Sequence, residues 1–251
     1  MADSCHHLPP ITFVSLHDAL ATPEKKGRYV RRLFDTIATR YDLITGLLSY
    51  GQDRRWKQRL VSLARVEGES RALDLACGTG DISFALASRG ARVVGLDVTP
   101  RMLQLARAKP QAASSMARFV AGDMMALPFR DAQFDVVSTG YGIRNVPDIE
   151  PALAEIKRVL RPGGLFLSLD FNRPRNAFVR DVYLAYLSAS GSLLGYLLHG
   201  DPDTYRYIPE TIRRYPGAEA VTTMLTQQGF ADAEWLPVLG GLMAIHRARA
   251  R

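Results

Sequence analysis

The sequence predicts an α/β fold with a doubly wound, mostly parallel, seven-stranded sheet and N-terminal helices. A short apolar run at residues 72–76 leads into the paired glycines of Gly78-Thr79-Gly80, and a helical pattern follows. A second apolar run, at residues 92–96, ends in Asp97, and strand and helix patterns alternate from there to residue 170. Alternation of this kind is typical of a parallel sheet that binds its ligands at the carboxyl ends of its strands.

The segment before the first strand divides into a leader and two helices. Residues 1–23 hold three prolines and only a short apolar run, which fits neither a secretory signal nor a transit peptide. We therefore expect a flexible leader. Helical patterns then cover residues 23–48 and 52–64, separated by Ser49-Tyr50-Gly51. These helices are expected to form an N-terminal helical cap over residues 24–65.

A single domain, residues 24–251, contains the predicted sheet. Its strands are expected near residues 72–76, 92–96, 117–121, 134–139, 164–170, 230–236 and 241–247. Its further helices are expected near residues 80–89, 100–108, 148–160 and 217–228. Arg161-Pro162-Gly163-Gly164 predicts a turn before the fifth strand. Residues 175–216 are predicted as a helical insertion on the substrate side, helical as far as Gly200 and irregular beyond it.

Composition and charge limit the classes of protein that the chain can belong to. With 251 residues, of which 47% are hydrophobic, it can bury one substantial core. Two cysteines, without a Cys/His cluster at metal-ligand spacing, predict a reducing, cytoplasmic setting and no metal. The net charge is +7, with basic helical segments between Lys25 and Arg71. A solvated helix face explains such segments, and contact with anionic lipid or nucleic acid is the alternative.

The glycine turn also indicates which nucleoside it binds. A dinucleotide-binding turn has a third glycine where this chain has Ser83, and Asp81 adds negative charge at the start of the helix. A pyrophosphate is poorly served there, whereas the adenosine and charged amino-acid end of S-adenosylmethionine suit glycine amides and nearby carboxylates. Asp97 is placed to bind the ribose hydroxyls. NAD is the alternative for this motif alone, and an ordinary glycine-rich turn is the third interpretation.

Further motifs extend along the chain, and Gly142-Ile143-Arg144-Asn145-Val146 is the most specific of them. The others are Phe34–Asp42, Leu48–Gly51 with Trp56-Lys57, Asp74–Asp81, Ala126–Phe129, Phe134-Asp135, Arg158–Gly164 and Tyr205–Ile208. In these motifs the chain resembles the ubiquinone/menaquinone biosynthesis C-methyltransferase family, within the class I S-adenosylmethionine-dependent methyltransferases, over nearly its whole length after the leader. The resemblance implies a Rossmann-like methyltransferase domain and an enzyme that uses S-adenosylmethionine.

The resemblance also implies a set of cofactor-binding residues. Thr79 is expected to contact the cofactor, and Asp97 to hold both ribose hydroxyls. Gly140 stands where the family often has serine, so its contact is expected to be lost or made by the backbone alone. The remaining expected contacts come from the adenine edge, the glycine turn and the first helices: Asp123 and Met124; Asp74, Gly78 and Gly80; and Tyr41, for which a hydrogen bond at a helix end is the alternative explanation.

The transfer itself requires positioning, because a sulfonium methyl group is already electrophilic. If a ring carbon beside a hydroquinone hydroxyl attacks it, a cation and hydrogen-bond donors near the developing phenolate lower the barrier. Arg144 and Asn145, expected just past the fourth strand, supply both, and with Tyr141 they are the predicted catalytic residues. Arg144 is too basic to accept a proton, so we expect it to orient the phenolate or a water. A helix cap or a structural salt bridge is the alternative role.

Three other features receive mainly structural interpretations. His199 is interpreted as an exposed loop residue, with a role as a base as the alternative, and His246 as a structural residue. Residues 182–198 carry no charge but are too short, and too often interrupted by serine and glycine, for a membrane span. They predict a buried helix whose apolar face either packs in the core or lines a channel for a polyprenyl tail.

The predicted function is C-methylation of a demethylated isoprenoid quinol of the demethylmenaquinol, phytyl-naphthoquinol or polyprenyl-methoxy-benzoquinol type. Methylation of another small aromatic or polyketide-like metabolite is the alternative, and a non-enzymatic scaffold is a third hypothesis. Nucleic acid is not an expected partner, because the fourth strand lacks the motifs that hold a flipped base. Expected partners are the quinol, a membrane surface in peripheral contact, and a second copy or a quinone-biosynthesis complex. Met125, Asp53 and Thr45 depart from the family's usual residues and leave the quinone head group open.

Overall fold

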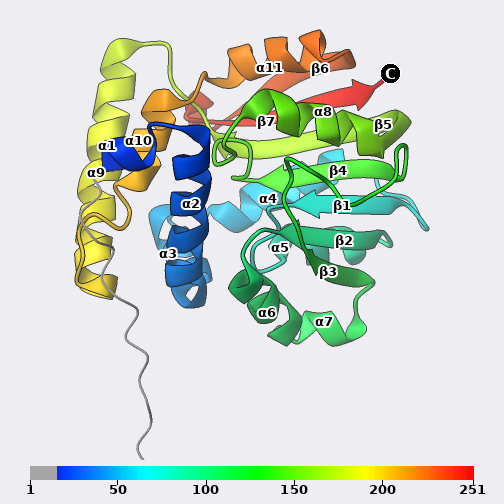
Figure 1. Ribbon diagram of the computed structural model, residues 1–251, viewed down its shortest axis with the longest axis horizontal. Coiled ribbons are helices and arrows are strands. Elements are labelled where there is room, and N and C mark those ends of the chain that lie inside the picture. Colours follow the sequence, from blue (N-terminus) through cyan, green and yellow to red (C-terminus); the bar gives the residue numbers. More distant parts are fainter. Residues whose placement is uncertain (1–15) are drawn as a thin grey trace, which may run out of the picture.

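The computed structural model describes residues 16–251, and its central layer is a seven-stranded sheet in the order β3-β2-β1-β4-β5-β7-β6 (Figure 1). Five strands run parallel: β1 (Arg71–Leu75), β2 (Arg92–Asp97), β3 (Ala117–Ala121), β4 (Phe134–Gly140) and β5 (Leu160–Phe171). β7 (Met243–Ala250) is antiparallel to β5 and pairs with β6 (Phe230–Val238). This arrangement confirms the predicted fold class.

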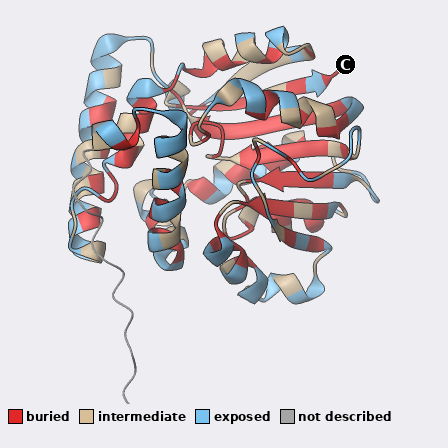
Figure 2. Ribbon diagram, in the orientation of Figure 1, coloured by how far each residue is buried: buried red, intermediate tan, exposed pale blue. Residues whose placement is uncertain are grey.

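Helices cover both faces of the sheet, so the core forms two layers (Figure 2). One face is covered by α4 (Asp53–Leu63), α5 (Asp81–Ala87) and α6 (Pro100–Ala108). The other is covered by α8 (Ile149–Val159) and α11 (Ala218–Gln227), and the short helix α7 (Gln111–Ser114) follows α6. Because both faces are buried, the central strands are apolar along most of their length.

The carboxyl ends of β1 and β4 mark the place where the topology favours a ligand. From β1 the sheet continues to β2 and β3 on one side, and to β4 and β5 on the other. A reversal of this kind leaves a crevice beyond the strand ends, which is where open α/β sheets bind their ligands. Helices from the N-terminal cap and from the segment after β5 lie at this edge (Figure 1).

The prediction of one helix over residues 23–48 is wrong, because the chain bends in the middle. The structure has α2 (Pro23–Ile37), a 3₁₀ turn η1 (Ala38–Arg40) and α3 (Tyr41–Leu48). Arg40 leaves helical geometry, with φ −112° and ψ 3°. Apolar side chains from α2 and α3 pack in the same cluster, so the spacing of apolar residues did not reveal the bend.

The last part of the predicted leader is structured. A short helix, α1 (Leu16–Ala19), precedes the buried side chain of Leu20. The Leu20 carbonyl accepts a hydrogen bond from Arg214 Nη1 at 2.8 Å, which ties this segment to a residue 194 positions further along the chain. Residues 1–15 of the predicted leader lie outside the described residues.

The segment after β4 differs from expectation in two places. The predicted turn at Arg161–Gly164 belongs to β5, because Leu160 already pairs with Phe134 and the ladder shifts register before Val136. The region predicted as irregular after Gly200 contains α10 (Tyr207–Arg214), an eight-residue helix whose buried residue Ile212 packs with Tyr183 and Leu184 of the preceding helix.

The uncharged stretch at residues 182–198 lies within α9 (Ala177–His199), as a helix. Only one side of it is buried, through residues such as Tyr183 and Leu187, while Val182 and Leu197 are exposed. The prediction of a buried helix is therefore only half right. Within residues 16–251, no helix combines the length and the apolarity needed to cross a membrane.

Candidate active site

Two adjoining cavities lie at the carboxyl edge of the sheet. The glycine-turn cavity, of about 110 Å³, is lined by residues that follow β1, β2, β3 and β4, among them Gly78, Asp97 and Asp123. The cap cavity, of about 200 Å³, lies under α2, α3, α9 and α10 and is lined mainly by apolar and tyrosine side chains. Both cavities are lined by Phe34, Tyr41, Tyr141 and Asn145. These shared residues form a common wall between the two cavities.

The glycine turn is tied to the end of β2. The Gly78 amide donates to Asp97 Oδ2 at 2.8 Å, and the Thr99 amide donates to Asp97 Oδ1 at 2.8 Å. Gly78 has φ +54°, and Gly80 has φ +86°, backbone conformations that favour glycine. A Cβ on Gly80 would lie 2.9 Å from the Phe84 and Phe119 rings. Gly80 lines neither cavity, so its visible role is to let the turn pack closely.

Polar groups suited to a nucleoside face the glycine-turn cavity. Asp97 lines it, and burial raises the pKa of the Asp97 carboxyl. Thr99 also lines it, and its buried Oγ1 has no hydrogen-bond partner in the described part of the chain. Since buried polar atoms are nearly always satisfied, Thr99 Oγ1 is the kind of group that a bound ligand pairs with. Asp123 and Met124 line the same cavity, as expected for an adenine edge.

Asp74 lies at the base of the glycine turn and is fully buried. Its two oxygens accept hydrogen bonds from Ser83 Oγ at 2.7 Å and Ser138 Oγ at 2.9 Å. Burial raises the pKa of Asp74 to about 7, against the lowering effect of the two hydroxyls. Ser83, which stands in place of a third glycine, therefore ties α5 to Asp74 on β1, and a role of Asp74 in organising the turn remains a prediction. A contact between Asp74 and a cofactor amino group remains a prediction.

Gly140 ends β4 beside the glycine-turn cavity. A Cβ at this position would lie 2.7 Å from Ile82 Cδ1. A serine here would displace the Ile82 side chain of α5. Glycine at this position therefore suits the close packing of α5 on the sheet.

Arg144 lines the cap cavity but is 4% exposed and already paired. Its Nε lies 3.2 Å from Asp170 Oδ1, and its backbone amide donates to Asp170 Oδ2 at 3.0 Å. Its Nη1 donates to Thr211 Oγ1, and its guanidinium lies 5.1 Å from the centre of the Phe171 ring. Arg144 therefore forms the structural salt bridge that was the alternative, and it also lines the predicted substrate cavity.

Asn145 is fixed by hydrogen bonds at both ends of its side-chain amide. Its Nδ2 donates to the Tyr141 carbonyl at 2.7 Å, and its Oδ1 accepts from the Tyr207 hydroxyl at 2.7 Å. Tyr207 belongs to α10 and is buried, which raises the pKa of its phenol. Arg144, Asn145 and Tyr141 are therefore brought together at the wall of the cap cavity, as expected, although their catalytic role remains a prediction.

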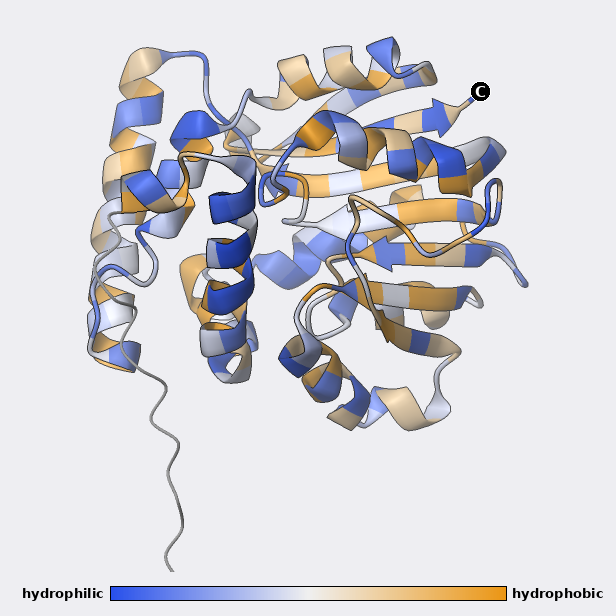
Figure 3. Cartoon of the chain, viewed as in Figure 1, coloured by the Kyte–Doolittle hydropathy of each residue, from blue (hydrophilic) through white to orange (hydrophobic). Residues whose placement is uncertain are grey.

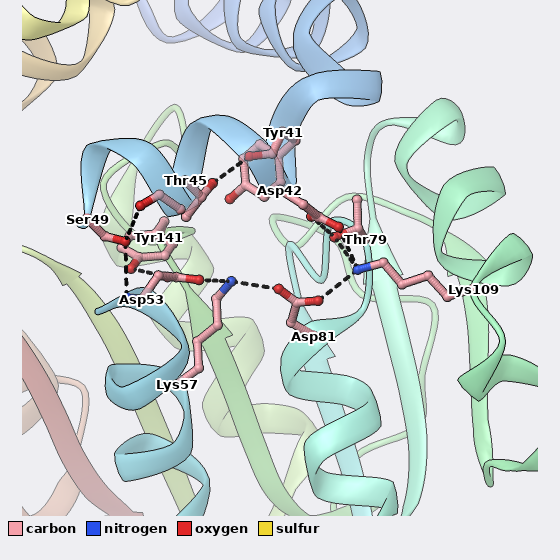
Figure 4. Close-up of polar contacts among 11 residues, drawn as sticks. Tyr41, Asp42, Thr45, Ser49, Asp53, Lys57, Thr79, Asp81, Lys109 and Tyr141 are labelled. Atoms are coloured by element: carbon pink, nitrogen blue, oxygen red, sulfur yellow. Dashed lines mark hydrogen bonds and ion pairs between the residues drawn. The ribbon is translucent and has the colours of Figure 1, made fainter. Parts of the chain in front are cut away.

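A polar network that sequence reasoning missed connects the cap to the glycine turn (Figure 4). The Tyr141 hydroxyl donates to Asp53 Oδ1 at 2.6 Å, and Asp53 Oδ2 lies 2.6 Å from Lys57 Nζ. The path continues from Lys57 to Asp81 at 3.0 Å, from Asp81 to Lys109 at 2.8 Å, and from Lys109 to Asp42 at 2.8 Å, where Thr79 Oγ1 donates at 2.5 Å. The spacing of Asp53 and Lys57 on one helix was the only local signal for it.

Tyr41 occupies the centre of this region. It lines both cavities and the small hollow of about 20 Å³ beside Lys57 and the glycine turn. Burial raises the pKa of the Tyr41 phenol to about 12. The bend at η1 places Tyr41 at the start of α3, where it lines the glycine-turn cavity. Its closure over the cofactor remains a prediction.

The two candidate histidines lie outside the cavities. His199 is the half-buried last residue of α9, not a loop residue as predicted, and its Nε2 lies 2.8 Å from the Tyr205 hydroxyl. His246 is buried between Ser168 and the Ala218 carbonyl, and burial lowers its pKa to about 4, which fits the expected structural role. Within residues 16–251, no group of three or more His, Cys, Asp or Glu side chains is arranged to hold a metal ion.

The sequence is similar to known methyltransferases over most of its length. The profile of the ubiE/COQ5 methyltransferase family matches residues 22–250. The demethylmenaquinone methyltransferase of Thermus thermophilus is 43% identical over 85% of this chain and 98% of its own length. The ubiquinone/menaquinone biosynthesis C-methyltransferase UbiE of Azotobacter vinelandii is 38% identical over 90% of this chain and 92% of its own.

Solved structures show the same fold at low sequence identity. A SAM-dependent methyltransferase from Thermotoga maritima superposes with a TM-score of 0.63 at 17% identity, over 88% of this chain and 100% of that chain. A SAM-dependent methyltransferase from Aquifex aeolicus gives a TM-score of 0.57 at 16% identity, over 78% and 89% respectively. These likenesses establish the architecture.

Proposed function

Since the chain belongs to the ubiE/COQ5 methyltransferase family, we propose that it transfers a methyl group from S-adenosylmethionine to a ring carbon of a demethylated isoprenoid quinol in quinone biosynthesis. The observation that carries the proposal is the common wall between the two cavities, formed with Tyr41, Tyr141 and Asn145. Methyl transfer requires the attacking carbon to lie in line with the sulfonium methyl group and away from water. Two adjoining cavities that share a wall, one beside the glycine turn and one mainly apolar, meet that requirement.

The glycine-turn cavity fits S-adenosylmethionine, which supplies an electrophilic methyl group when bound. Asp97 is placed for the ribose hydroxyls, and the unpartnered Thr99 Oγ1 offers a further hydrogen bond. Asp123 and Met124 lie where the adenine is expected, and Gly78 and Thr79 border the amino-acid end. The acidic side chains here suit a ligand that carries an ammonium and a sulfonium group better than they suit a pyrophosphate.

The cap cavity fits an aromatic ring with an apolar tail. Arg144 and Asn145 place hydrogen-bond donors at its wall, beside the residues shared with the glycine-turn cavity. Donors and a cation at this place stabilise negative charge on a ring oxygen while the neighbouring ring carbon attacks. Arg144 keeps its proton, so its contribution is to orient the ring oxygen and to stabilise its charge.

The proposed reaction can be tested by product analysis. The purified protein is incubated with S-adenosylmethionine carrying a labelled methyl group and, separately, with demethylated naphthoquinols, demethylated benzoquinols and tail-free phenols. The expected result is a carbon-bound methyl group on a quinol with an isoprenoid tail, located by mass spectrometry. Transfer only to tail-free aromatics, or to oxygen, would support the alternative of another small aromatic substrate.

We also propose that the mouth of the cap cavity contacts a membrane surface. Tyr50, 75% exposed, and the exposed Tyr186 and Leu239 line this cavity, so it opens onto apolar surface. The helices α3 and α9 carry many hydrophobic residues (Figure 3). The exposed apolar side chains on them and on the neighbouring turns, called here the apolar face, are Leu43, Leu47, Tyr50, Phe178, Val179, Val182, Tyr186, Leu193, Tyr196, Leu197 and Leu239. Exposed basic residues of α2 add attraction to anionic lipid. A membrane-borne quinol could then enter without crossing water.

The membrane proposal can be tested with vesicles that contain anionic phospholipid. We expect the protein to sediment with them, and Leu193→Asp with Leu197→Asp to abolish the effect, because charged groups on the apolar face cannot enter the interface. Met116→Asp is the control, since Met116 is also an exposed apolar residue but lies before β3, away from this surface. If the unaltered protein forms a dimer that these substitutions dissolve, and vesicles bind neither, the apolar face is a contact between copies instead.

A further inference from the structure

Tyr141 carries one hydroxyl proton at the wall between the two cavities, and the structure commits that proton to Asp53. We infer that Asp53 fixes the direction of the Tyr141 hydrogen bond, so that the site accepts a ring hydroxyl and disfavours a ring carbonyl. Asp53 is thus assigned as a positioning residue that selects the reduced form of the ring. The inference rests on the proposed function, because it takes the cap cavity as the place where the aromatic ring binds.

The charge on Asp53 is held in place by its neighbours. Its Oδ2 lies 2.6 Å from Lys57 Nζ, and both side chains are about nine-tenths buried. Burial opposes the charge on Lys57, but Tyr41, Asp53 and Asp81 outweigh it and raise the pKa of Lys57. Asp53 thus forms a close ion pair with Lys57, and the carboxylate of an ion pair can only accept hydrogen bonds.

The Tyr141 hydroxyl therefore has only one arrangement open to it. It donates to Asp53 Oδ1 at 2.6 Å, and burial together with Asp53 raises its pKa well above the ordinary value, so it keeps its proton. A phenol has a single hydrogen and two lone pairs. With the hydrogen directed at Asp53, the oxygen can offer only lone pairs to a second partner.

The position of Tyr141 is fixed as firmly as its proton. Its amide donates to the Leu169 carbonyl at 2.7 Å, and its carbonyl accepts from Asn145 Nδ2 at 2.7 Å. Its ring lies 5.6 Å from the ring of Phe171, centre to centre. Tyr141 lines both cavities, whereas Asp53 lines neither. Asp53 therefore acts on the bound ring through Tyr141.

This arrangement distinguishes the two redox forms of a quinone ring. A quinol hydroxyl can donate to the Tyr141 oxygen, and this donation increases the electron density on the ring carbon beside the hydroxyl. A quinone carbonyl would place its own lone pairs against those of Tyr141. A site with a committed acceptor rejects a ligand that lacks the matching hydrogen, because the buried acceptor is then left unpaired.

The test compares one ligand that has this hydrogen with another in which a methyl group replaces it. One is a geranylated naphthalenediol monomethyl ether, which keeps one free hydroxyl, and the other is the corresponding dimethyl ether, which has none. Binding is measured by calorimetry with saturating S-adenosylhomocysteine, so no methyl transfer takes place. We expect the unaltered protein to bind the monomethyl ether about tenfold more tightly than the dimethyl ether.

Asp53→Asn should bring this ratio close to one. The amide can turn its oxygen to Lys57 and donate from its nitrogen to the Tyr141 oxygen, which frees the Tyr141 proton to point into the cavity. Tyr141→Phe removes the acceptor and should have the same effect on the ratio; it carries the test if Asp53→Asn does not fold. Asp42→Asn is the matched control, because Asp42 belongs to the same network but contacts Lys109 and Thr79 instead of Tyr141, and the tenfold ratio should persist.

A merely structural Asp53 would give a different result. Asp53→Asn would then weaken both ligands equally and leave the tenfold ratio unchanged, which would overturn the inference. An unchanged ratio in Tyr141→Phe would overturn it as well. Since the measurement involves no turnover, it separates this inference from the proposed reaction. If the protein methylates a quinol but binds both ethers equally, only the inference is contradicted. If it prefers the ligand with the free hydroxyl but methylates no quinol, only the substrate assignment is contradicted.

Discussion

The glycine-turn cavity and the cap cavity are built in different ways. The glycine turn of the first is held by contacts that are short in sequence, Ser83 to Asp74, nine residues apart, and Gly78 to Asp97, nineteen apart, and Ser138 to Asp74, 64 apart, ties β1 to β4. The second depends on contacts between distant segments, such as Asn145 to Tyr207, 62 residues apart. The bend of the glycine turn thus follows from local strand-turn-helix geometry, whereas the cap cavity exists only when distant segments have folded together.

The two halves also stabilise their buried carboxylates differently. Asp74, under the glycine turn, is held by two serine hydroxyls and titrates with a pKa raised to about 7. Asp170, beside the cap cavity, is held by the Arg144 guanidinium, which opposes the rise in its pKa that burial causes. Loss of a partner should therefore be far more costly beside the cap cavity than under the glycine turn.

The largest expected effect is from Arg144→Ala, which leaves Asp170 buried without a counter-charge. We expect the free energy of unfolding to fall by about 3 to 5 kcal/mol, measured by urea denaturation. Turnover should be lost even without urea, where the variant is folded, while the affinity for S-adenosylmethionine changes little. The double variant with Asp170→Asn should recover part of the stability but none of the turnover. If Arg144→Ala is as stable as the unaltered protein, the buried pair does not contribute to the stability of the fold.

On the glycine-turn side, Asp97→Ala should act mainly on the cofactor. Loss of charge-assisted hydrogen bonds to two ribose hydroxyls is expected to weaken S-adenosylmethionine binding about 100-fold, or about 3 kcal/mol, measured by calorimetry. Stability should fall less, because the Gly78 and Thr99 amides that now donate to Asp97 lie beside a cavity that water can enter. Unchanged affinity would show that the nucleoside binds elsewhere.

The pH dependence of stability offers a second measurement on the same half. Because burial raises the folded-state pKa of Asp74 from 3.8 to about 7, its neutral form contributes stability that is complete at low pH and is lost as pH rises through about 7. Between about pH 5 and about pH 8 the loss should be about 2 to 3 kcal/mol. The comparison is with Asp74→Asn at each pH, so that other titrating groups cancel. A parallel pH dependence in both proteins would contradict the assignment.

The same contrast explains what the sequence could and could not predict. The strands and Asp97 follow from apolar runs and from the position of a carboxylate after a strand, which are local signals. The link from Tyr141 to Asp53 spans 88 residues, and neither residue carries a local sign of the other. The bend at Ala38–Arg40 and the helix α10 were missed for a related reason, since tertiary packing decides them. Arg144 was identified as a candidate, but its partner Asp170 was not.

The smallest expected effect concerns Gly140, where the family resemblance and the packing of the structure favour different residues. The family resemblance leads one to expect a serine, but a Cβ at this position would lie 2.7 Å from Ile82 Cδ1. The clash involves the end of a flexible side chain, so Gly140→Ser should cost only about 1 kcal/mol. Ile82→Val removes the clashing carbon, at a cost of its own of about 1 kcal/mol.

A double-mutant cycle of these two substitutions measures that clash directly. If Ile82 Cδ1 is the obstacle, the double variant should lose about 1 kcal/mol less unfolding free energy than the sum of the losses in the two single variants, because the valine makes room for the serine. Simple additivity would mean that the strain lies elsewhere in the β4 end. Cofactor affinity measured on the same proteins then tells whether a serine hydroxyl, once accommodated, adds a contact to the glycine-turn cavity. A gain there would show that glycine at this position reflects the packing of α5, since the cofactor itself would accept a serine.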